Sequence, residues 1–129
     1  MTTAYSFGMT PADVQSWLDR YIEAWRSYDR GQIKALFAEE ASYQYHPWDE
    51  PLRGADAIAD DWLANQDEPG SWEASYRPLM VDGQRAITTG HSSYDNGRRY
   101  WNLWEVDFDD QGRCIRFVEW FMRQPTEQG

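Results

Sequence analysis

The chain has 129 residues and a formal net charge of −10, with 41% hydrophobic and 26% charged residues. This length predicts a single domain over residues 1–129, and the composition excludes a largely disordered chain. An acidic surface repels phosphate backbones and anionic lipids, so we expect neither nucleic acid nor a membrane as a partner. Aromatic residues reach 16%, which is more than a core of this size needs.

The single cysteine, Cys114, cannot form an internal disulfide, and we expect it to be a core residue in a reducing compartment. No Cys or His residues have the spacing of zinc ligands, so neither a metal nor another cofactor is expected. The N-terminus has no basic segment followed by an apolar run, and no stretch approaches the roughly 18 apolar residues of a membrane span. We therefore expect a cytoplasmic protein.

Three helices are predicted in the first half of the chain. The first covers about Pro11–Tyr28, where Thr10 is a suitable cap and apolar residues recur at spacings of three and four. Asp29 is expected to cap a short second helix, and the third spans Asp56–Asn65. Between the second and third helices, Ala41–His46 has the alternation of a strand and is followed by proline.

From Ser71 onward the apolar pattern alternates, which is typical of strands. The four predicted strands are Ser71–Val81, Arg85–Tyr94, Arg98–Phe108 and Arg113–Arg123. Short connections that end in glycine predict hairpin turns, so neighbouring strands should be antiparallel. Helices followed by such a meander indicate an α+β fold, with a curved antiparallel sheet wrapped around the helices. Residues 1–9 and 124–129 are expected to be flexible ends.

The two faces of the predicted sheet are both rich in apolar residues. On Arg98–Phe108, we take the face with Tyr100, Asn102 and Trp104 as the inner, helix-facing side. All the helices are expected on that side, so the outer face lacks a cover within the chain. We therefore expect a homodimer packed sheet to sheet. The residues expected near this contact are Trp101, Leu103, Val118 and Trp120.

Several local strings occur in a familiar order along nearly the whole chain. They are Tyr21–Trp25, Asp29 with Leu36–Ala41, Pro51–Gly54 with Ala57 and Ile58, Val106–Asp109 with Gly112–Ile115, and Phe117–Trp120. In these strings the chain resembles the nuclear transport factor 2-like superfamily and, within it, the SnoaL-like branch. The resemblance implies a cone-shaped, cystatin-like α+β fold, whose bent sheet and three helices enclose an apolar pocket, usually in a dimer. Members include ketosteroid isomerases, polyketide cyclases, dehydratases, epoxide hydrolases and non-catalytic binding domains, so the fold alone does not identify a reaction.

The resemblance can be followed position by position. Members similar to ketosteroid isomerase place an oxyanion-donating Tyr on the first helix, and Tyr21 stands at the matching position. Their general-base Asp precedes a Pro at the end of the first strand, where this chain has His46. Their second acidic donor corresponds to Trp104, so two of the three positions depart from that pattern. An epoxide hydrolase of this fold needs two inward Asp residues bridged by Arg, and the predicted inner face carries no Asp.

His46 is the first candidate for a general acid or base, because the pKa of histidine ordinarily lies near neutrality. The alternative is a loop histidine that is half solvated and bonded locally. Tyr43 and Tyr45 alternate with Gln44 and His46, so only one of these sets can point inward unless Pro47 bends the strand end.

Glu119 is the second candidate, since it lies between Phe117 and Phe121. Burial among aromatic rings would raise the pKa of this carboxyl and suit it to acid–base chemistry. The alternative is a salt bridge to an arginine such as Arg116, Arg99 or Arg53.

Further candidates are ligand contacts rather than acids or bases. Asn102 could orient a ligand carbonyl or hydroxyl, or could bond to neighbouring backbone. The alternation leaves open whether His91 faces inward or outward, and Gly90 beside it predicts a bulge that bends the sheet. Core packing is the alternative for each aromatic residue. The full set of predicted ligand contacts is Trp25, Tyr28, Tyr45, Trp48, Trp62, His91, Tyr100, Asn102 and Trp104.

The sequence therefore predicts a SnoaL-like protein that holds a small apolar or aromatic molecule inside the sheet. One hypothesis is a cofactor-independent isomerase, dehydratase or cyclase, with His46 as acid or base. Tyr21 and Asn102 would then be hydrogen-bond donors and Glu119 a partner of the base. The other hypothesis is a non-catalytic module for ligand binding or dimerisation.

Overall fold

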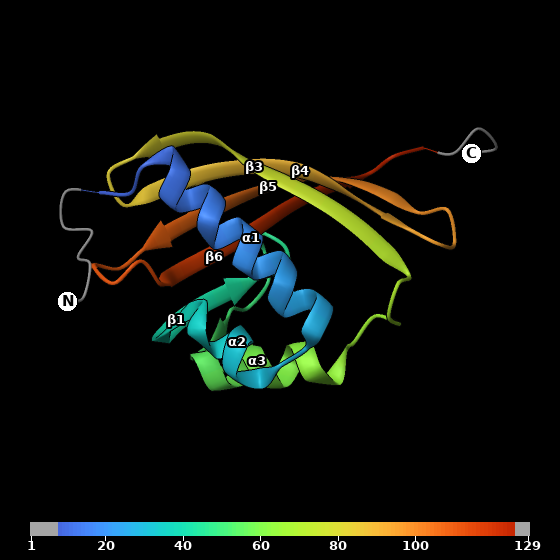
Figure 1. The fold of residues 1–129 in the computed structure, drawn as a ribbon, viewed down its shortest axis with the longest axis horizontal. Helices are drawn as coiled ribbons and strands as arrows, with labels where there is room; N and C mark the ends of the chain where they lie inside the picture. Colours follow the sequence, from blue (N-terminus) through green and yellow to red (C-terminus); the bar gives the residue numbers. More distant parts are fainter. Residues whose placement is uncertain (1–7, 126–129) are drawn as a thin grey trace.

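Residues 8–125 of the chain are described here from a computed structural model. The helices are α1 (Pro11–Ser27), α2 (Arg30–Ala35) and α3 (Ala55–Ala64), and the strands are β1 (Phe37–Gln44), β2 (Leu52–Arg53), β3 (Trp72–Asp82), β4 (Arg85–Tyr94), β5 (Arg99–Phe108) and β6 (Cys114–Arg123). Figure 1 shows α1 lying across one face of the curved sheet, while α2 and α3 gather near β1. The predicted α+β fold class is confirmed.

The first helix begins where its capping residues predict it. Thr10 Oγ1 accepts a hydrogen bond from the Asp13 N–H at 3.1 Å, and the Asp13 carboxylate accepts from the Thr10 N–H at 2.9 Å. This capping box satisfies backbone donors that have no partner within the helix. The helix stops at Tyr28, whose φ of 49° is left-handed. The buried face of α1 consists of Val14, Trp17, Leu18, Tyr21 and Ala24.

The two shorter helices pack against each other beside β1. The Asp29 carboxylate caps α2 by accepting from the Gln32 N–H at 2.9 Å, as its position in the sequence predicts. Helix α3 begins at Ala55, one residue before the predicted start, and follows Gly54 at a φ of 97°. Glycine adopts this φ without steric strain, so the chain can turn sharply from β2 into α3.

The six strands form one open sheet in the order β2-β1-β6-β5-β4-β3. Strands β3 to β6 are an antiparallel meander, as the hairpin turns predict. Strand β1, however, pairs in parallel with β6, so the expectation of a purely antiparallel sheet is wrong. The predicted strand Ala41–His46 is also displaced, because β1 starts at Phe37. The exposed Glu39 and Glu40 interrupt its alternating pattern where the pairing register shifts.

Burial alternates along β5 as predicted. Asn102 and Trp104 are buried on the inner face, whereas Trp101 on the outer face is 55% exposed. The neighbouring strand continues both faces, since Glu119 pairs with Trp104 and Trp120 pairs with Leu103. The inner face thus combines aromatic rings with a few polar side chains.

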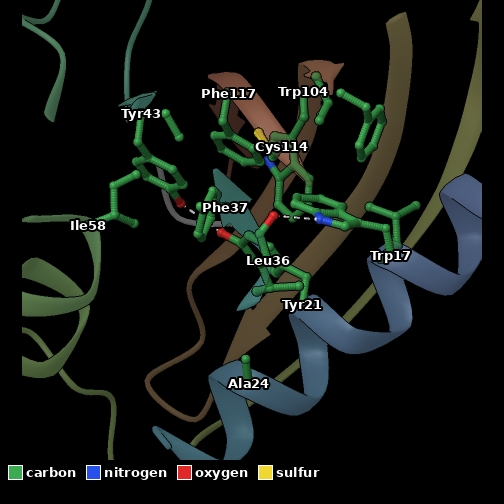
Figure 2. Close-up of a cluster of buried hydrophobic side chains, with 14 of the residues drawn as sticks. Trp17, Tyr21, Ala24, Leu36, Phe37, Tyr43, Ile58, Trp104, Cys114 and Phe117 are labelled. Carbon is green, nitrogen blue, oxygen red and sulfur yellow. Dashed lines mark hydrogen bonds between the residues drawn. The ribbon is translucent and has the colours of Figure 1, made fainter. Parts of the chain in front are cut away.

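Aromatic side chains make up much of the buried core between α1 and the sheet (Figure 2). The Trp17 Nε1–H donates to the Leu36 carbonyl at 3.0 Å and so connects α1 to the segment that leads into β1. Cys114 is fully buried in this core, as predicted, and burial raises the pKa of its thiol. The rings within 5.5 to 6.4 Å of the Trp17 ring are those of Tyr21, Phe37, Phe108 and Phe117.

Most of the two ends predicted to be flexible, 1–9 and 124–129, lies outside the described residues. Inside that range, the Met9 N–H donates to the Gly83 carbonyl at 2.8 Å, and the Gln124 N–H donates to the Arg99 carbonyl at 2.8 Å. Both flanking residues are therefore attached to the sheet. No helix formed by residues 8–125 combines the length and hydrophobicity needed to cross a membrane.

Candidate functional site

A cavity of about 380 Å³ lies between α1, the end of α3 and the inner face of the sheet. Its size falls within the range of small-molecule sites, and its walls are mostly aromatic. We call it the aromatic cavity. It brings together many residues that the sequence singled out: Tyr21, Trp25, Tyr28, Tyr45, Trp62, Tyr100, Asn102, Trp104 and Glu119.

Glu119 places a carboxylate on the wall of the aromatic cavity. Its Oε2 atom accepts hydrogen bonds from Asn102 Nδ2 at 2.6 Å and from Trp104 Nε1 at 3.0 Å. These two donors come from adjacent inward positions of β5, opposite Glu119 in the sheet. They fix one carboxylate oxygen and leave Oε1 without a protein partner within the described chain. Oε1 is therefore the atom that can meet a ligand.

The alternative expected for Glu119, a salt bridge to arginine, is not formed within residues 8–125. Arg116 instead lies 3.6 Å from Glu105 and 3.5 Å from Asp107, on the outer side of the sheet. Nor does any group of three or more His, Cys, Asp or Glu side chains in this range have the arrangement of a metal site.

Burial raises the pKa of Glu119 above its ordinary value. The hydrogen bonds from Trp104 and Asn102, and the nearby His46, oppose this effect only in part. A carboxyl whose pKa is raised holds its proton to higher pH than an exposed glutamate does. Such a group is better matched to accept and return a proton near neutral pH.

Tyr21 of α1 and Tyr43 of β1 form a hydroxyl pair that also lines the cavity, with 2.7 Å between their Oη atoms (Figure 2). Both hydroxyls are buried, and burial raises the pKa of both well above the ordinary value. Both therefore stay protonated at neutral pH. Only one of the two O–H groups is used between them, so the pair keeps a second O–H to donate to a ligand oxygen.

A second group of bonds ties α3 and its connection to β3 to the cavity wall. The Asp67 carboxylate accepts from Trp25 Nε1 at 3.0 Å, and the Asp67 N–H donates to Tyr28 Oη at 2.8 Å. Tyr45 Oη donates to the Asp61 carboxylate at 2.5 Å. These bonds fix the lining rings of Trp25, Tyr28 and Tyr45. The carboxylates of Asp61 and Asp67 each accept one of them.

The structure places His46 outside the aromatic cavity. Strand β1 ends at Gln44, whose Nε2 lies 3.4, 3.1 and 3.0 Å from the carbonyls of His46, Pro47 and Asp49 and so organises a tight loop. His46 Nδ1 is bonded to the Asp49 carboxylate at 2.8 Å, and its ring stacks on Trp48. Alternation along a strand does not predict the direction of a side chain beyond the strand end. The sequence therefore could not decide whether His46 points inward or outward.

His46 and Trp48 line a second hollow of about 470 Å³, toward the outer side of the sheet. We call it the outer hollow. Glu119 reaches its wall as well, so His46 and Glu119 share this space although only Glu119 lines the aromatic cavity. His91 lines neither space, since it is exposed on the outer face with its ring 5.5 Å from that of Trp101. Three predicted site residues, His46, Trp48 and His91, therefore lie apart from those that line the aromatic cavity.

Sequence reasoning missed part of the cavity wall. Tyr76 could have been found, because the register aligns Tyr76 with Gly90 and Asn102 and so continues the inner face across three strands. Residues on the connection between α3 and β3 carry no such periodic signal. The missed lining residues are Tyr43, Asn65, Asp67, Tyr76, Ser92, Tyr94, Arg98 and Phe121.

Comparison with known proteins agrees with this architecture. Residues 18–122 match the family model of the SnoaL-like domain. An NTF-2 like protein of unknown function from Burkholderia xenovorans LB400 has a TM-score of 0.71 at 21% identity, over 93% of this chain and 90% of that one. A putative ketosteroid isomerase from Kribbella flavida DSM 17836 has a TM-score of 0.68 at 15% identity, over 90% and 82% of the two chains. An LEH-like epoxide hydrolase from M. tuberculosis has a TM-score of 0.66 at 15% identity, over 87% and 84%. The resemblance drawn from the sequence is confirmed: the chain shares the fold of the NTF-2 like proteins and belongs to the SnoaL-like family.

Proposed function

We propose that the protein binds a small, planar, largely apolar molecule in the aromatic cavity and that Glu119 moves a proton on it. The observation that carries this proposal is the Glu119 carboxylate, which Asn102 and Trp104 hold by one oxygen while the other stays without a protein partner. Planar ligands suit the cavity because rings of tyrosine and tryptophan offer both stacking surface and polar groups.

The chemistry that fits this arrangement is abstraction of a proton beside a ligand carbonyl. Glu119 Oε1 takes the proton, the electron pair of the C–H bond moves toward the carbonyl oxygen, and an enolate forms. The free O–H of the Tyr21–Tyr43 pair can donate to that oxygen and stabilise its charge. Return of the proton to another carbon completes an isomerisation, and loss of a neighbouring hydroxyl, protonated by Glu119, completes a dehydration. The base role predicted for His46 passes to Glu119 in this proposal, because His46 does not line the aromatic cavity.

A second candidate function is ligand binding without chemistry. It is favoured by the two positions at which the isomerase-like pattern has acids and this chain has His46 and Trp104. Trp104 in particular uses its N–H to hold Glu119, which also fits a carboxylate that only anchors a bound molecule.

Proton exchange of a model ketone distinguishes these two functions. In D₂O, the wild-type protein is expected to accelerate deuterium exchange at the acidic C–H positions of 2-tetralone, a planar bicyclic ketone, as followed by NMR. Glu119→Gln should lower the catalysed rate by about 100-fold, because an amide cannot take the proton. The wild-type rate should fall as pH decreases through a pKa above the ordinary value of glutamate, since burial raises the pKa of Glu119.

The matched control is Glu105→Gln, which makes the same change of charge on the outward side of β5. This variant should exchange 2-tetralone at the wild-type rate. Exchange that survives in Glu119→Gln would remove the base role from Glu119. If 2-tetralone quenches tryptophan fluorescence on binding but does not exchange faster than in buffer, the binding function is favoured instead.

We also propose that two copies of the chain associate through their outer sheet faces. Trp101, Trp120 and Met122 are 55%, 49% and 73% exposed, which is unusual for such large apolar side chains. Of the other residues predicted at the contact, Leu103 is half-buried and Val118 is only 2% exposed, so the tryptophans would supply most of the surface.

The molar mass in solution tests this association. At micromolar concentration, light scattering should give the mass of a dimer for the wild type and of a monomer for Trp120→Glu, because a carboxylate would be buried without a partner. Leu79→Glu, at a residue of β3 that is 56% exposed, is the control and should remain dimeric. A monomeric wild type would end this proposal.

A further inference from the structure

Arg98 is the cation of the aromatic cavity, whose described lining otherwise carries the acids Asp67 and Glu119. It lies in the turn between β4 and β5. Its N–H donates to Asn96 Oδ1 at 3.0 Å, and its carbonyl accepts from the Tyr94 N–H at 2.9 Å. The backbone at this position is therefore fixed, and the turn directs the side chain to one place on the cavity wall.

Two tyrosines hold the guanidinium. Its central carbon lies 5.2 Å from the ring centre of Tyr94 and 6.0 Å from that of Tyr100, and Nη1 donates to Tyr100 Oη at 3.3 Å. Aromatic faces attract a guanidinium and orient its plane, so the group is arranged before any ligand arrives.

The charge of Arg98 is nevertheless unmatched. Its Nε atom is buried and has no hydrogen-bond partner, and no carboxylate of residues 8–125 forms an ion pair with it. Four of the chain's eleven arginines form ion pairs within residues 8–125, namely Arg30, Arg85, Arg113 and Arg116. A guanidinium is best satisfied by a carboxylate that accepts two of its N–H groups. A ligand carboxylate in the aromatic cavity, which Arg98 lines, would supply such a partner.

Strand geometry separates this position from Glu119. Arg98 Nη1 is bonded to the Tyr100 hydroxyl, whereas the Glu119 carboxylate is bonded to Asn102 and Trp104, which lie two and four residues further along β5. A ligand anion would be repelled by Glu119 and attracted by Arg98. The two charges therefore orient a bound molecule, with its anionic group at Arg98 and its other end toward Glu119.

We infer that the ligand is an aromatic or conjugated carboxylate, and that Arg98 binds its carboxylate group. This inference rests on the proposed function, which it deepens by naming the chemical class of the ligand. The ring system lies among the cavity tyrosines and tryptophans, and the end remote from the carboxylate meets Glu119 and the Tyr21–Tyr43 pair.

Binding of two matched probes tests the inference. 2-Naphthoate and 2-naphthamide have the same ring and nearly the same shape, but only the first carries a charge at neutral pH. Calorimetry on the wild type should give about tenfold tighter binding for the naphthoate, as a charge-assisted hydrogen bond predicts. In NMR spectra, both probes should shift the indole N–H signal of Trp104 in the aromatic cavity and leave that of Trp120 on the outer face unchanged.

Arg98→Met should abolish the preference by weakening the naphthoate alone, while the amide keeps its affinity. Arg99→Met removes the same charge from an exposed neighbouring residue and should keep the wild-type preference. Equal affinities of the wild type for the two probes would be enough to overturn the inference. The proposed binding in the aromatic cavity would still be supported if the Trp104 signal shifted. A preference that persists in Arg98→Met would also overturn it. Failure of both probes to bind would overturn the inference together with the proposed function.

Discussion

Replacing Trp17 by alanine is expected to lower the free energy of unfolding by about 3–5 kcal/mol, the range found when a large buried aromatic side chain is truncated. Trp17 is fully buried and lies at the centre of the rings that join α1 to the sheet. The deletion also removes one of the two hydrogen bonds that the buried Leu36 carbonyl accepts, the other being donated by the Cys114 N–H. Domains of this size are stable by only about 5–15 kcal/mol, so the variant should unfold at markedly lower urea concentration.

Two further variants separate the contributions to this loss. Trp17→Phe keeps most of the ring contacts but removes the N–H, so it should cost about 1–3 kcal/mol, the effect of one lost hydrogen bond plus a small void. Trp48→Ala makes the same truncation at a side chain that is 79% exposed and should change the free energy of unfolding by less than about 1 kcal/mol. Urea unfolding followed by circular dichroism measures all three. Equal stability of Trp17→Ala and the wild type would show that α1 is not held to the sheet in this way.

Elements with local signals could be predicted from the sequence. The capping residues Thr10 and Asp29 locate the starts of α1 and α2, and the glycine-ended turns locate β4 to β6 within one residue. Such signals depend on a few neighbouring residues, so one sequence is enough to read them. The inward-facing residues of β5 could be predicted for the same reason, because alternation of side chains depends only on the sequence of the strand.

Features that depend on distant contacts could not be predicted. The parallel pairing of β1 with β6 joins residues 74 to 77 positions apart, and parallel strands have no connecting turn that reveals them. The position of His46 depends on the bonds from Gln44 beyond the strand end. The partner of Glu119 is a similar case, since arginine was the expected neighbour and tryptophan and asparagine donors from β5 take its place.

The candidate site shows the same division. Tyr21 was predicted from the family resemblance, Asn102 from strand alternation and Glu119 as an acid among aromatic residues. All three line the aromatic cavity. Tyr43 was considered only for its strand register, yet its hydroxyl is bonded to that of Tyr21. Arg98 gave no signal, because one arginine beside another in a turn resembles ordinary surface charge until its tyrosine neighbours are placed in space.

Replacing Gly90 by alanine is expected to lower the free energy of unfolding by about 3 kcal/mol, at the upper end of the usual cost of overpacking. A Cβ atom at this position would lie 2.1 Å from the Ser75 carbonyl oxygen and 2.3 Å from Cδ1 of Tyr76. The first is backbone of β3, which can yield only if β3 and β4 separate. The register shift of this strand pair lies between Pro78 and Met80, so the bulge predicted at Gly90 is wrong, and close approach explains the glycine.

The same substitution should also alter the aromatic cavity. The Tyr76 ring lies over Gly90 and packs on Trp104, with 4.1 Å between the ring centres, so a methyl group beneath it would displace it against the wall that holds Glu119. We expect weaker binding of 2-naphthamide in Gly90→Ala under conditions where the variant is still folded, and a shifted indole N–H signal of Trp104. Gly31→Ala makes the same chemical change in α2, where the added Cβ meets only the Asp29 side chain at 3.2 Å. That control should change stability by less than about 1 kcal/mol and leave binding unchanged. A Gly90→Ala protein as stable as the wild type would mean that β3 does not approach β4 so closely, and that Tyr76 does not form this wall.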